Sequence, residues 1–178
     1  MTEVTDIIVA ARAGETVGTL TAGARTFICS LGRSGLTSSK HEGDGGTPIG
    51  SFRLRQLFYR PDRGDAPKTG LPVQALTKSD GWCDAPEDPH YNQRVDLPYP
   101  ASAETMWRSD GLYDLCCVIG YNDAPVEKNR GSAIFLHLLR EENGEIKPTE
   151  GCVALRRPDL EEVLALCSPE TVFTIEVI

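Results

Sequence analysis

The sequence predicts a mainly β fold of the β-rich α+β class, and three observations indicate it. Runs of β-branched and apolar residues recur along the chain, glycine, proline and aspartate separate these runs, and helical periodicity is rare. The chain has 178 residues, 40% of them hydrophobic, which suits one domain with a proper core. We therefore expect a single domain over residues 1–178.

The expected strands follow one another along most of the chain. Each is a run of residues that pack well on a pleated sheet, ended by a turn-forming residue. They cover residues 6–11, 16–20, 26–31, 50–59, 71–76, 115–120, 132–139 and 171–177.

Helical signal is confined to two segments, a short one over residues 102–107 and a clearer C-terminal helix over 158–167. Pro158 suits the first turn of the second helix, and the acidic Asp159 complements its dipole. Three irregular stretches, residues 34–47, 60–70 and 81–101, are too long to be mere connections, so we expect them to build a cleft. The inward face of the C-terminal helix is expected to consist of Leu160, Val163, Leu164 and Cys167.

Charge and hydropathy disfavour several partners. Acidic residues number 26 against 18 basic ones, and the net charge of −8 disfavours nucleic acid and anionic membranes. No stretch reaches the ~20 apolar residues of a membrane span. Residues 1–6 include two acids, and the apolar run over 7–11 is too short for a signal core. A cytoplasmic location is expected, or a periplasmic one if the true start lies upstream.

Six cysteines are present, none in Cys-x-x-Cys spacing, so we expect reduced thiols. Three of them stand in strand-like apolar runs and are expected in the core. A zinc site would need three or four convergent ligands, which the spacing of His90, His137 and the thiols does not suggest, so no metal or cofactor is predicted. The expected core cysteines are Cys29, Cys116 and Cys117.

Two residues offer chemistry that the others do not. His137 lies in the apolar run Phe-Leu-His-Leu-Leu, and Cys152 follows Gly151 in a loop. A free thiol is mostly protonated near pH 7, and a neighbouring imidazole can take its proton. If the two side chains meet, they form a base and a nucleophile for acyl transfer.

Two ordered motifs resemble those of YkuD-type L,D-transpeptidase catalytic domains. In that family a histidine is followed by Ser/Thr-His-Gly-Cys, and here His137 is followed by Thr149-Glu150-Gly151-Cys152. Upstream, Thr47-Pro48-Ile49-Gly50-Ser51-Phe52 resembles the family's Thr-Pro-x-Gly-x-Phe. The resemblance extends from about residue 26 onward and implies a YkuD-like β-sandwich or barrel-like domain with long loops and one clear C-terminal helix.

The resemblance also implies an activity on peptidoglycan stem tetrapeptides. Cys152 would cleave the L,D bond before the terminal D-alanine and hold the acyl group as a thioester. His137 would take the thiol proton and return one to the departing amine. Backbone amides in the turn at Gly151 and Cys152 would stabilise the oxyanion. A backbone carbonyl often orients the histidine in this family.

This chain departs from the family pattern at two positions. Glu150 stands where a second histidine is common, and Ala154 lies near a position often held by arginine or asparagine. Glu150 either orients a group or meets a cationic substrate, or it is a solvated loop carboxylate. Arg156 is a candidate to bind a substrate carboxylate, with exposed surface charge as the alternative.

Other candidates for substrate binding flank the expected cleft. Thr149 belongs to the cysteine motif, and Tyr121 and Asn122 follow a strand, where Asn122 could equally be ordinary turn chemistry. Arg60 would anchor a carboxylate. Trp82 would form a flat wall or cap the core.

The expected cytoplasmic location favours water as the acceptor, hence an L,D-carboxypeptidase of peptidoglycan recycling. The alternatives are an L,D-transpeptidase that forms 3-3 crosslinks or exchanges amino acids, a non-catalytic module that binds wall peptides, and a cysteine peptidase of unrelated substrate. The sequence does not indicate an oligomeric state.

Overall fold

Strands account for most of the regular structure, as predicted. The computed structural model describes residues 4–178, so the first three residues of the expected domain 1–178 lie outside the described residues. Within the described part, sixteen strands and one helix occur in this order: β1 Asp6–Ala11, β2 Val17–Ala22, β3 Arg25–Ser30, β4 Leu36–Thr37, β5 Thr47–Pro48, β6 Gly50–Tyr59, β7 Val73–Ala75, β8 Asp80–Cys83, β9 Arg94–Asp96, β10 Ala103–Thr105, β11 Leu115–Ile119, β12 Phe135–Leu138, β13 Arg140–Glu142, β14 Glu145–Lys147, β15 Val153–Leu155, α1 Arg157–Leu164 and β16 Val172–Val177.

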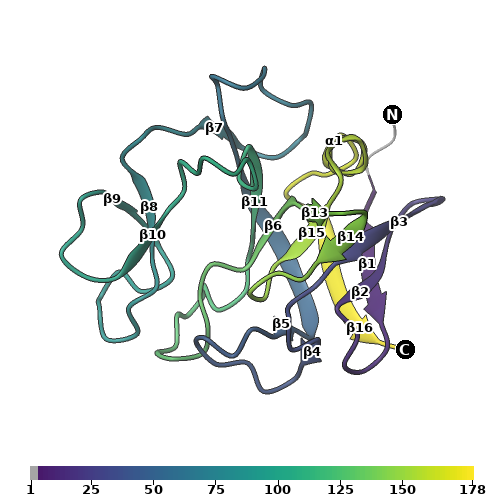
Figure 1. Cartoon of the computed structure of the whole chain (residues 1–178), viewed down its shortest axis with the longest axis horizontal. Helices are drawn as coiled ribbons and strands as arrows, with labels where there is room; N and C mark the ends of the chain where they lie inside the picture. Colours follow the sequence, from purple (N-terminus) through teal and green to yellow (C-terminus); the bar gives the residue numbers. More distant parts are fainter. Residues whose placement is uncertain (1–3) are drawn as a thin grey trace.

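The main sheet closes on itself. Its strand order is β11-β12-β15-β3-β2-β1-β16-β6-β7, and β11 pairs with β6 as well as with β12. The strands from β11 to β6 therefore form a closed circuit, with β7 attached beside β6 (Figure 1). The first and last strands, β1 and β16, lie side by side in parallel within this circuit. This arrangement confirms the expected barrel-like architecture.

Alternation along β12 divides its residues between two apolar clusters. Leu136 and Leu138 belong to the larger cluster, which also contains the buried residues of β1, β3 and β15. Phe135 belongs to a second cluster together with Trp82 and Cys152. Successive side chains of a strand point to opposite faces, so the two clusters lie on opposite sides of β12. A strand covered on both faces is apolar throughout, which explains the run Phe-Leu-His-Leu-Leu.

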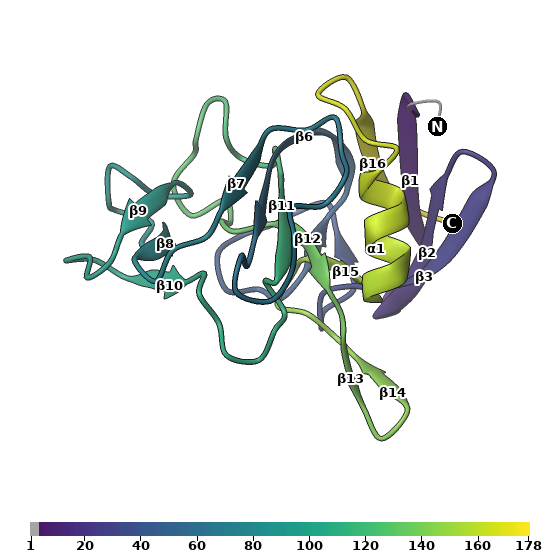
Figure 2. The same cartoon turned by 90° about the horizontal axis from the view of Figure 1, so that it is seen from above.

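A small sheet stands outside the closed circuit. Strands β10, β8 and β9 pair in that order over residues 80–105 (Figure 2). The helix predicted over residues 102–107 is wrong, because Ala103–Thr105 forms β10 and pairs with β8 instead. A segment this short is a marginal helix in isolation, so pairing with a neighbouring strand decides its conformation.

The C-terminal helix is confirmed, although it begins one residue earlier and ends three residues earlier than predicted. Pro158 lies in its first turn beside Asp159. Leu160, Val163 and Leu164 are buried against the larger apolar cluster, and Cys167 is buried just beyond the helix. Among the residues the model describes, no helix is long and apolar enough to cross a membrane.

Candidate active site

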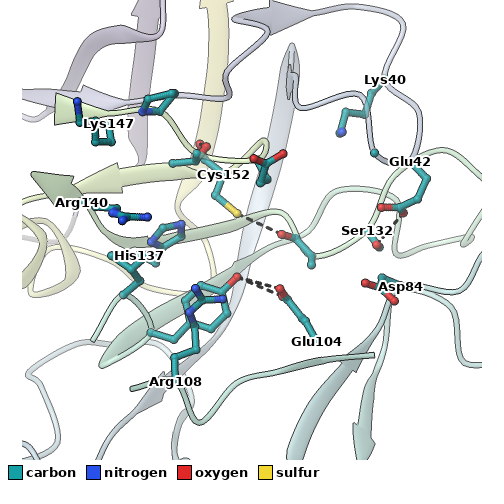
Figure 3. A pocket seen from close by; sticks show the side chains of 17 residues that line it. Lys40, Glu42, Asp84, Glu104, Arg108, Ser132, His137, Arg140, Lys147 and Cys152 are labelled. Carbon is teal, nitrogen blue, oxygen red and sulfur yellow. Dashed lines mark hydrogen bonds between the residues drawn. The ribbon is translucent and has the colours of Figure 1, made fainter. Parts of the chain in front are cut away.

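His137 and Cys152 line the same cavity, as the sequence led us to expect. The cavity has a volume of about 400 Å³ and lies beside the second apolar cluster (Figure 3). Its walls come from five parts of the chain, and most of the side chains that line it are charged or polar. They are Lys40, Glu42, Asp84, Glu104, Arg108, Tyr113, Ser132, His137, Arg140, Lys147, Thr149, Glu150 and Cys152, with Gly43, Leu112, Ala133 and Pro148 between them.

Adjacent parallel strands bring the two residues together. His137 lies on β12 and pairs with Ala154 on β15, two residues beyond Cys152. Side chains two residues apart along a strand point to the same face, and so do paired residues on neighbouring strands. His137 and Cys152 therefore face the same side of the sheet, although fifteen residues separate them in the sequence.

The thiol of Cys152 is buried and hydrogen-bonded. Its Sγ donates to the carbonyl oxygen of Ala133 at 3.2 Å and accepts from the amide of Phe135 at 3.3 Å. Only 6% of the residue is exposed. Burial disfavours the thiolate and raises the pKa of Cys152 to about 12. The thiol is therefore protonated at neutral pH in this state.

The imidazole of His137 is oriented by the main chain. Its Nδ1 lies 2.8 Å from the carbonyl oxygen of Leu138, an acceptor, so Nδ1 carries the proton and Nε2 is left as a base. The ring packs edge-on against Tyr113, with 5.2 Å between the centroids. Burial lowers the pKa of His137 to about 4. Burial thus favours the neutral forms of both thiol and imidazole, and Sγ donates to Ala133 in this state.

A tight loop holds Cys152 at the start of β15. Gly151 has a φ of +136°, and a Cβ at this residue would lie 2.8 Å from the carbonyl oxygen of Gly46. The hydroxyl of Thr149 donates to the carbonyl of Cys152 at 2.7 Å and accepts from the amide of Gly151 at 3.1 Å. Among the hydrogen bonds of residues 4–178, none is donated by the amide of Cys152. That amide is therefore a candidate donor to an oxyanion.

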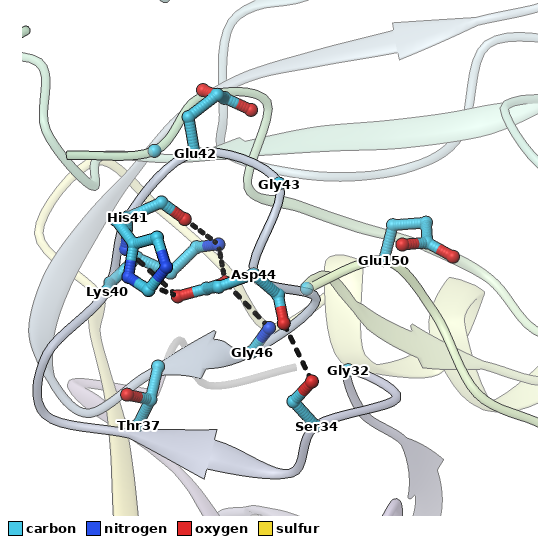
Figure 4. Close-up of polar contacts among 12 residues, drawn as sticks. Gly32, Ser34, Thr37, Lys40, His41, Glu42, Gly43, Asp44, Gly46 and Glu150 are labelled. Atoms are coloured by element: carbon cyan, nitrogen blue, oxygen red, sulfur yellow. Dashed lines mark hydrogen bonds and ion pairs between the residues drawn. The ribbon is translucent and has the colours of Figure 1, made fainter. Parts of the chain in front are cut away.

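The loop over residues 40–46, just before the Thr-Pro motif, forms another rim of the cavity. Asp44 accepts from the ammonium of Lys40 at 2.5 Å and from the amides of His41 and Gly46, so the loop folds around one carboxylate (Figure 4). Lys40 and Glu42 thereby line the cavity. Thr47, in the Thr-Pro segment, accepts from the amide of Gly32 at 2.8 Å. Gly32 forms a β-bridge with Thr149, so these contacts tie the Thr-Pro motif to the loop of Cys152.

A wall that the sequence did not predict stands across the cavity from Cys152. It contains Glu104 of β10, with Tyr113 and Arg108 from the chain between β10 and β11. The hydroxyl of Tyr113 donates to the carboxylate of Glu104 at 3.2 Å. Burial raises the pKa of Glu104 to about 7. Glu104 has no local sequence signal, because its segment resembles a short helix and reaches the site only through the small sheet.

Glu150 and Thr149 lie at the cavity, as predicted, but in different roles. The side chain of Glu150 is 81% exposed and pairs with Arg33, Nε to carboxylate 2.8 Å. This geometry favours the solvated rim carboxylate over a substitute for the family's second histidine. Thr149 is engaged with the backbone of Gly151 and Cys152 through its hydroxyl, so it holds the loop.

Three predicted binding residues lie outside this cavity because each is occupied elsewhere. Asn122 has a φ of 50° and bonds through its side chain to the backbone of Glu127 and Gly131, which is turn chemistry. The hydroxyl of Tyr121 donates to the carbonyl of Arg130. Trp82 is buried in the second cluster, edge-on to Phe135, and caps the core.

Two predicted carboxylate anchors are also placed elsewhere. Arg60 is buried, stacks 3.8 Å from the ring centroid of Trp107 and bonds to Asp62, so its role is structural. Arg156 pairs with Glu141 on the surface at 3.1 Å. The stretch 60–70, expected at the cleft, lies away from it, whereas 34–47 and 81–101 each contribute to its walls.

All six cysteines are free and buried, and Cys29, Cys116 and Cys117 lie in the apolar clusters as expected. Within residues 4–178, no group of three or more histidine, cysteine, aspartate or glutamate side chains is arranged to hold a metal ion.

Comparison with family models agrees with the motif resemblance. The family model YkuD, described as the L,D-transpeptidase catalytic domain, matches residues 6–177. Solved structures similar to the chain include L,D-transpeptidase 1 of Mycobacterium tuberculosis, with a TM-score of 0.40, 12% identity and coverage of 97% of this chain and 62% of the other. Another is L,D-transpeptidase 3 of the same organism, with a TM-score of 0.43, 12% identity and coverage of 96% and 60%. The chain thus spans less than two thirds of either structure's length. No curated protein matches its sequence.

Proposed function

We propose an activity for this chain from the premise that it belongs to the YkuD family of L,D-transpeptidase catalytic domains. The activity is cysteine-dependent acyl transfer on peptidoglycan stem tetrapeptides, with cleavage of the L,D bond before the terminal D-alanine. The observation that carries the proposal is the shared cavity of Cys152 and His137. Its volume of about 400 Å³ lies within the range of ligand pockets and suits a short peptide.

In the first half-reaction, Sγ of Cys152 attacks the carbonyl carbon of the L,D bond while Nε2 of His137 takes the thiol proton. The C–N bond then breaks, and the imidazolium returns that proton to the departing amine of D-alanine. The Nδ1 contact with Leu138 supports this role, because it leaves Nε2 as the acceptor. The carbonyl of Ala133 holds the thiol until the substrate arrives.

The developing oxyanion would be stabilised by the amide of Cys152. Its availability supports this assignment, whereas the amide of Gly151 is engaged by Thr149. A single preorganised donor of this kind accelerates acyl transfer by about 10²–10³-fold.

We propose water as the acceptor of the acyl group, which makes the protein an L,D-carboxypeptidase. The polar wall of the cavity supports this choice, because Glu104, Arg108 and Ser132 are groups that hydrogen-bond to water. Transfer to an amine, by crosslinking or amino-acid exchange, is the competing reaction that the family's name favours.

Product analysis separates these reactions. The purified protein is incubated with a stem tetrapeptide, alone and with an acceptor amine, and the products are weighed by mass spectrometry. Tripeptide in both samples is the expected result, and a crosslinked product without tripeptide would overturn the hydrolase proposal.

A carbapenem tests the nucleophile separately. We expect one covalent adduct in the intact mass, absent in Cys152→Ala and retained in Cys167→Ala, a matched removal of a buried thiol away from the cavity. Binding of tetrapeptide without adduct or turnover would instead identify a non-catalytic wall-peptide module. Turnover of ordinary L-peptides alone would indicate an unrelated cysteine peptidase.

A further inference from the structure

Glu104 is a carboxyl group inside the cavity that the first half-reaction does not use. It lies on β10 and points toward the same space as Cys152, from the opposite wall (Figure 3). Tyr113 donates to both of its oxygens, at 3.2 and 3.3 Å. The ring of the same tyrosine contacts His137. Glu104 and His137 therefore flank one aromatic side chain at the reacting centre.

No ion pair explains the position of this carboxylate. Arg108, whose charge partly lowers the pKa of Glu104, pairs with Asp110 at 2.5 Å, and Glu104 forms no ion pair with a lysine, arginine or histidine among the described residues. Buried acidic groups are usually paired, so a partly buried carboxylate that lines a cavity and forms no ion pair of its own is a candidate for a functional role.

The two titratable groups of the site differ in proton affinity. Burial holds the pKa of His137 at about 4, whereas burial raises that of Glu104 to about 7. A general base works best when its pKa lies near the working pH, so near neutrality Glu104 is the stronger base toward water. The charged and titratable groups that face Glu104 are Tyr113, Arg108, Asp84, Glu42, Cys116 and Cys152.

We propose that Glu104 is the base of the second half-reaction, which deprotonates the water that attacks the Cys152 thioester. The inference rests on the proposed function. A C–O bond forms as the carboxylate takes a proton from water, and the C–S bond then breaks. The departing sulfur recovers its proton from Glu104, and the product carboxylic acid loses its own proton to solvent. His137 serves the first half-reaction and Glu104 the second, with Tyr113 in contact with both.

The isosteric variant Glu104→Gln tests this division. Protein and stem tetrapeptide are mixed, quenched at intervals and weighed. We expect the acyl-enzyme of Glu104→Gln to form at the wild-type rate and to accumulate, with steady-state turnover reduced by about 10²-fold or more. In the wild type, hydrolysis of the acyl-enzyme should accelerate as the pH rises through about 7, where Glu104 loses its proton, and the variant should lack that limb.

Two further variants keep the test specific. Glu104→Asp should restore part of the hydrolysis, and Glu170→Gln, which removes an exposed carboxylate elsewhere, should match the wild type. Wild-type hydrolysis and an unchanged pH profile in Glu104→Gln would overturn the inference alone, as would equal loss of both half-reactions. A wild-type protein that forms no acyl-enzyme with the tetrapeptide would overturn the proposed function together with the inference.

Discussion

The thiol of Cys152 donates a hydrogen bond to the carbonyl oxygen of Ala133 at 3.2 Å. Ala133 presents that carbonyl from a backbone with a φ of 55°, in the left-handed region, and its own amide donates to Asn92 at 2.9 Å. The side chain of Asn92 therefore holds the backbone at Ala133, and the Ala133 carbonyl in turn holds Cys152 as a neutral thiol.

The pH dependence of alkylation should reveal that Cys152 is a protonated thiol in the free protein. Because burial raises the pKa of Cys152 to about 12, its reaction with iodoacetamide in the free protein should keep accelerating up to pH 10 without a plateau. The rate is measured by peptide mass spectrometry of the residue. A plateau near pH 8 would mean that the thiolate forms at an ordinary pKa and that this account of the resting site is wrong.

Acidification should destabilise the protein through His137. Its folded pKa of about 4 lies below the ordinary 6.5, so the unfolded state binds more protons between these values, and stability falls as the pH falls from 6.5 to 4. The full shift corresponds to about 3 kcal/mol. In urea unfolding at several pH values, His137→Gln should lose less stability on acidification than the wild type. Equal losses would contradict the buried neutral imidazole.

Glu104 should have the opposite effect on stability. Its folded pKa of about 7 exceeds the ordinary 4.5, so the folded state binds more protons between these values, and stability falls as the pH rises from 4.5 to 7. Glu104→Gln should therefore gain stability relative to the wild type as the pH rises from 4.5 to 7. The same unfolding series checks this, and a constant difference between the two proteins would refute it.

Gly151→Ala should disrupt the nucleophile loop. The added Cβ would lie 2.8 Å from the carbonyl oxygen of Gly46, at a φ of +136°. Gly144→Ala is the matched control, because Gly144 also has a positive φ, of +79°, but open space around its Cβ position. We expect Gly151→Ala to lower the free energy of unfolding by more than Gly144→Ala and to lose carbapenem acylation, which Gly144→Ala keeps. Similar acylation rates for both variants would show that the close packing is dispensable.

Asn92→Ala should weaken the cavity wall. The side-chain oxygen of Asn92 accepts from Trp82 and Ala133, and its nitrogen donates to the carbonyls of Tyr121 and Asn122. Loss of these four bonds leaves buried groups unpaired, at about 1–3 kcal/mol each before relaxation. We expect a large drop in the urea midpoint and slower acylation of Cys152. A urea midpoint close to that of the wild type would contradict the stabilising role of these four hydrogen bonds.

Patterns within short segments predicted the strands of the closed sheet, except the three-residue β15, and the loop of Cys152. Apolar alternation and turn residues indicate local structure, and Gly151 before Cys152 indicates a tight loop. The hairpin of β13 and β14 also has a local sequence signal: Asn143-Gly144, both with positive φ, is typical of a two-residue hairpin turn.

The rest of the site depends on contacts between distant segments. Glu104 reaches the cavity because β10 pairs with β8, and Arg60 leaves it because its guanidinium stacks on Trp107. Asn92, an unremarkable residue in a long loop, holds Ala133 from forty-one positions away. The residue pattern of one segment says nothing about its contacts with a distant segment. Local propensity alone therefore could not predict the positions of Glu104, Arg60 and Asn92.

The small sheet β8–β10 supplies Asp84 and Glu104, whereas Cys152 and His137 belong to the closed sheet. The proposed attack and the proposed acceptor handling therefore reside in different sheets, which the hydrogen bonds of Asn92 join. Residues 80–105 form a module that also carries Asn92, which holds Ala133 beside the thiol, so the module diversifies without disturbing the nucleophile only where Asn92 is kept. Exchange of that module between relatives is a route by which one scaffold would acquire a new choice of acceptor.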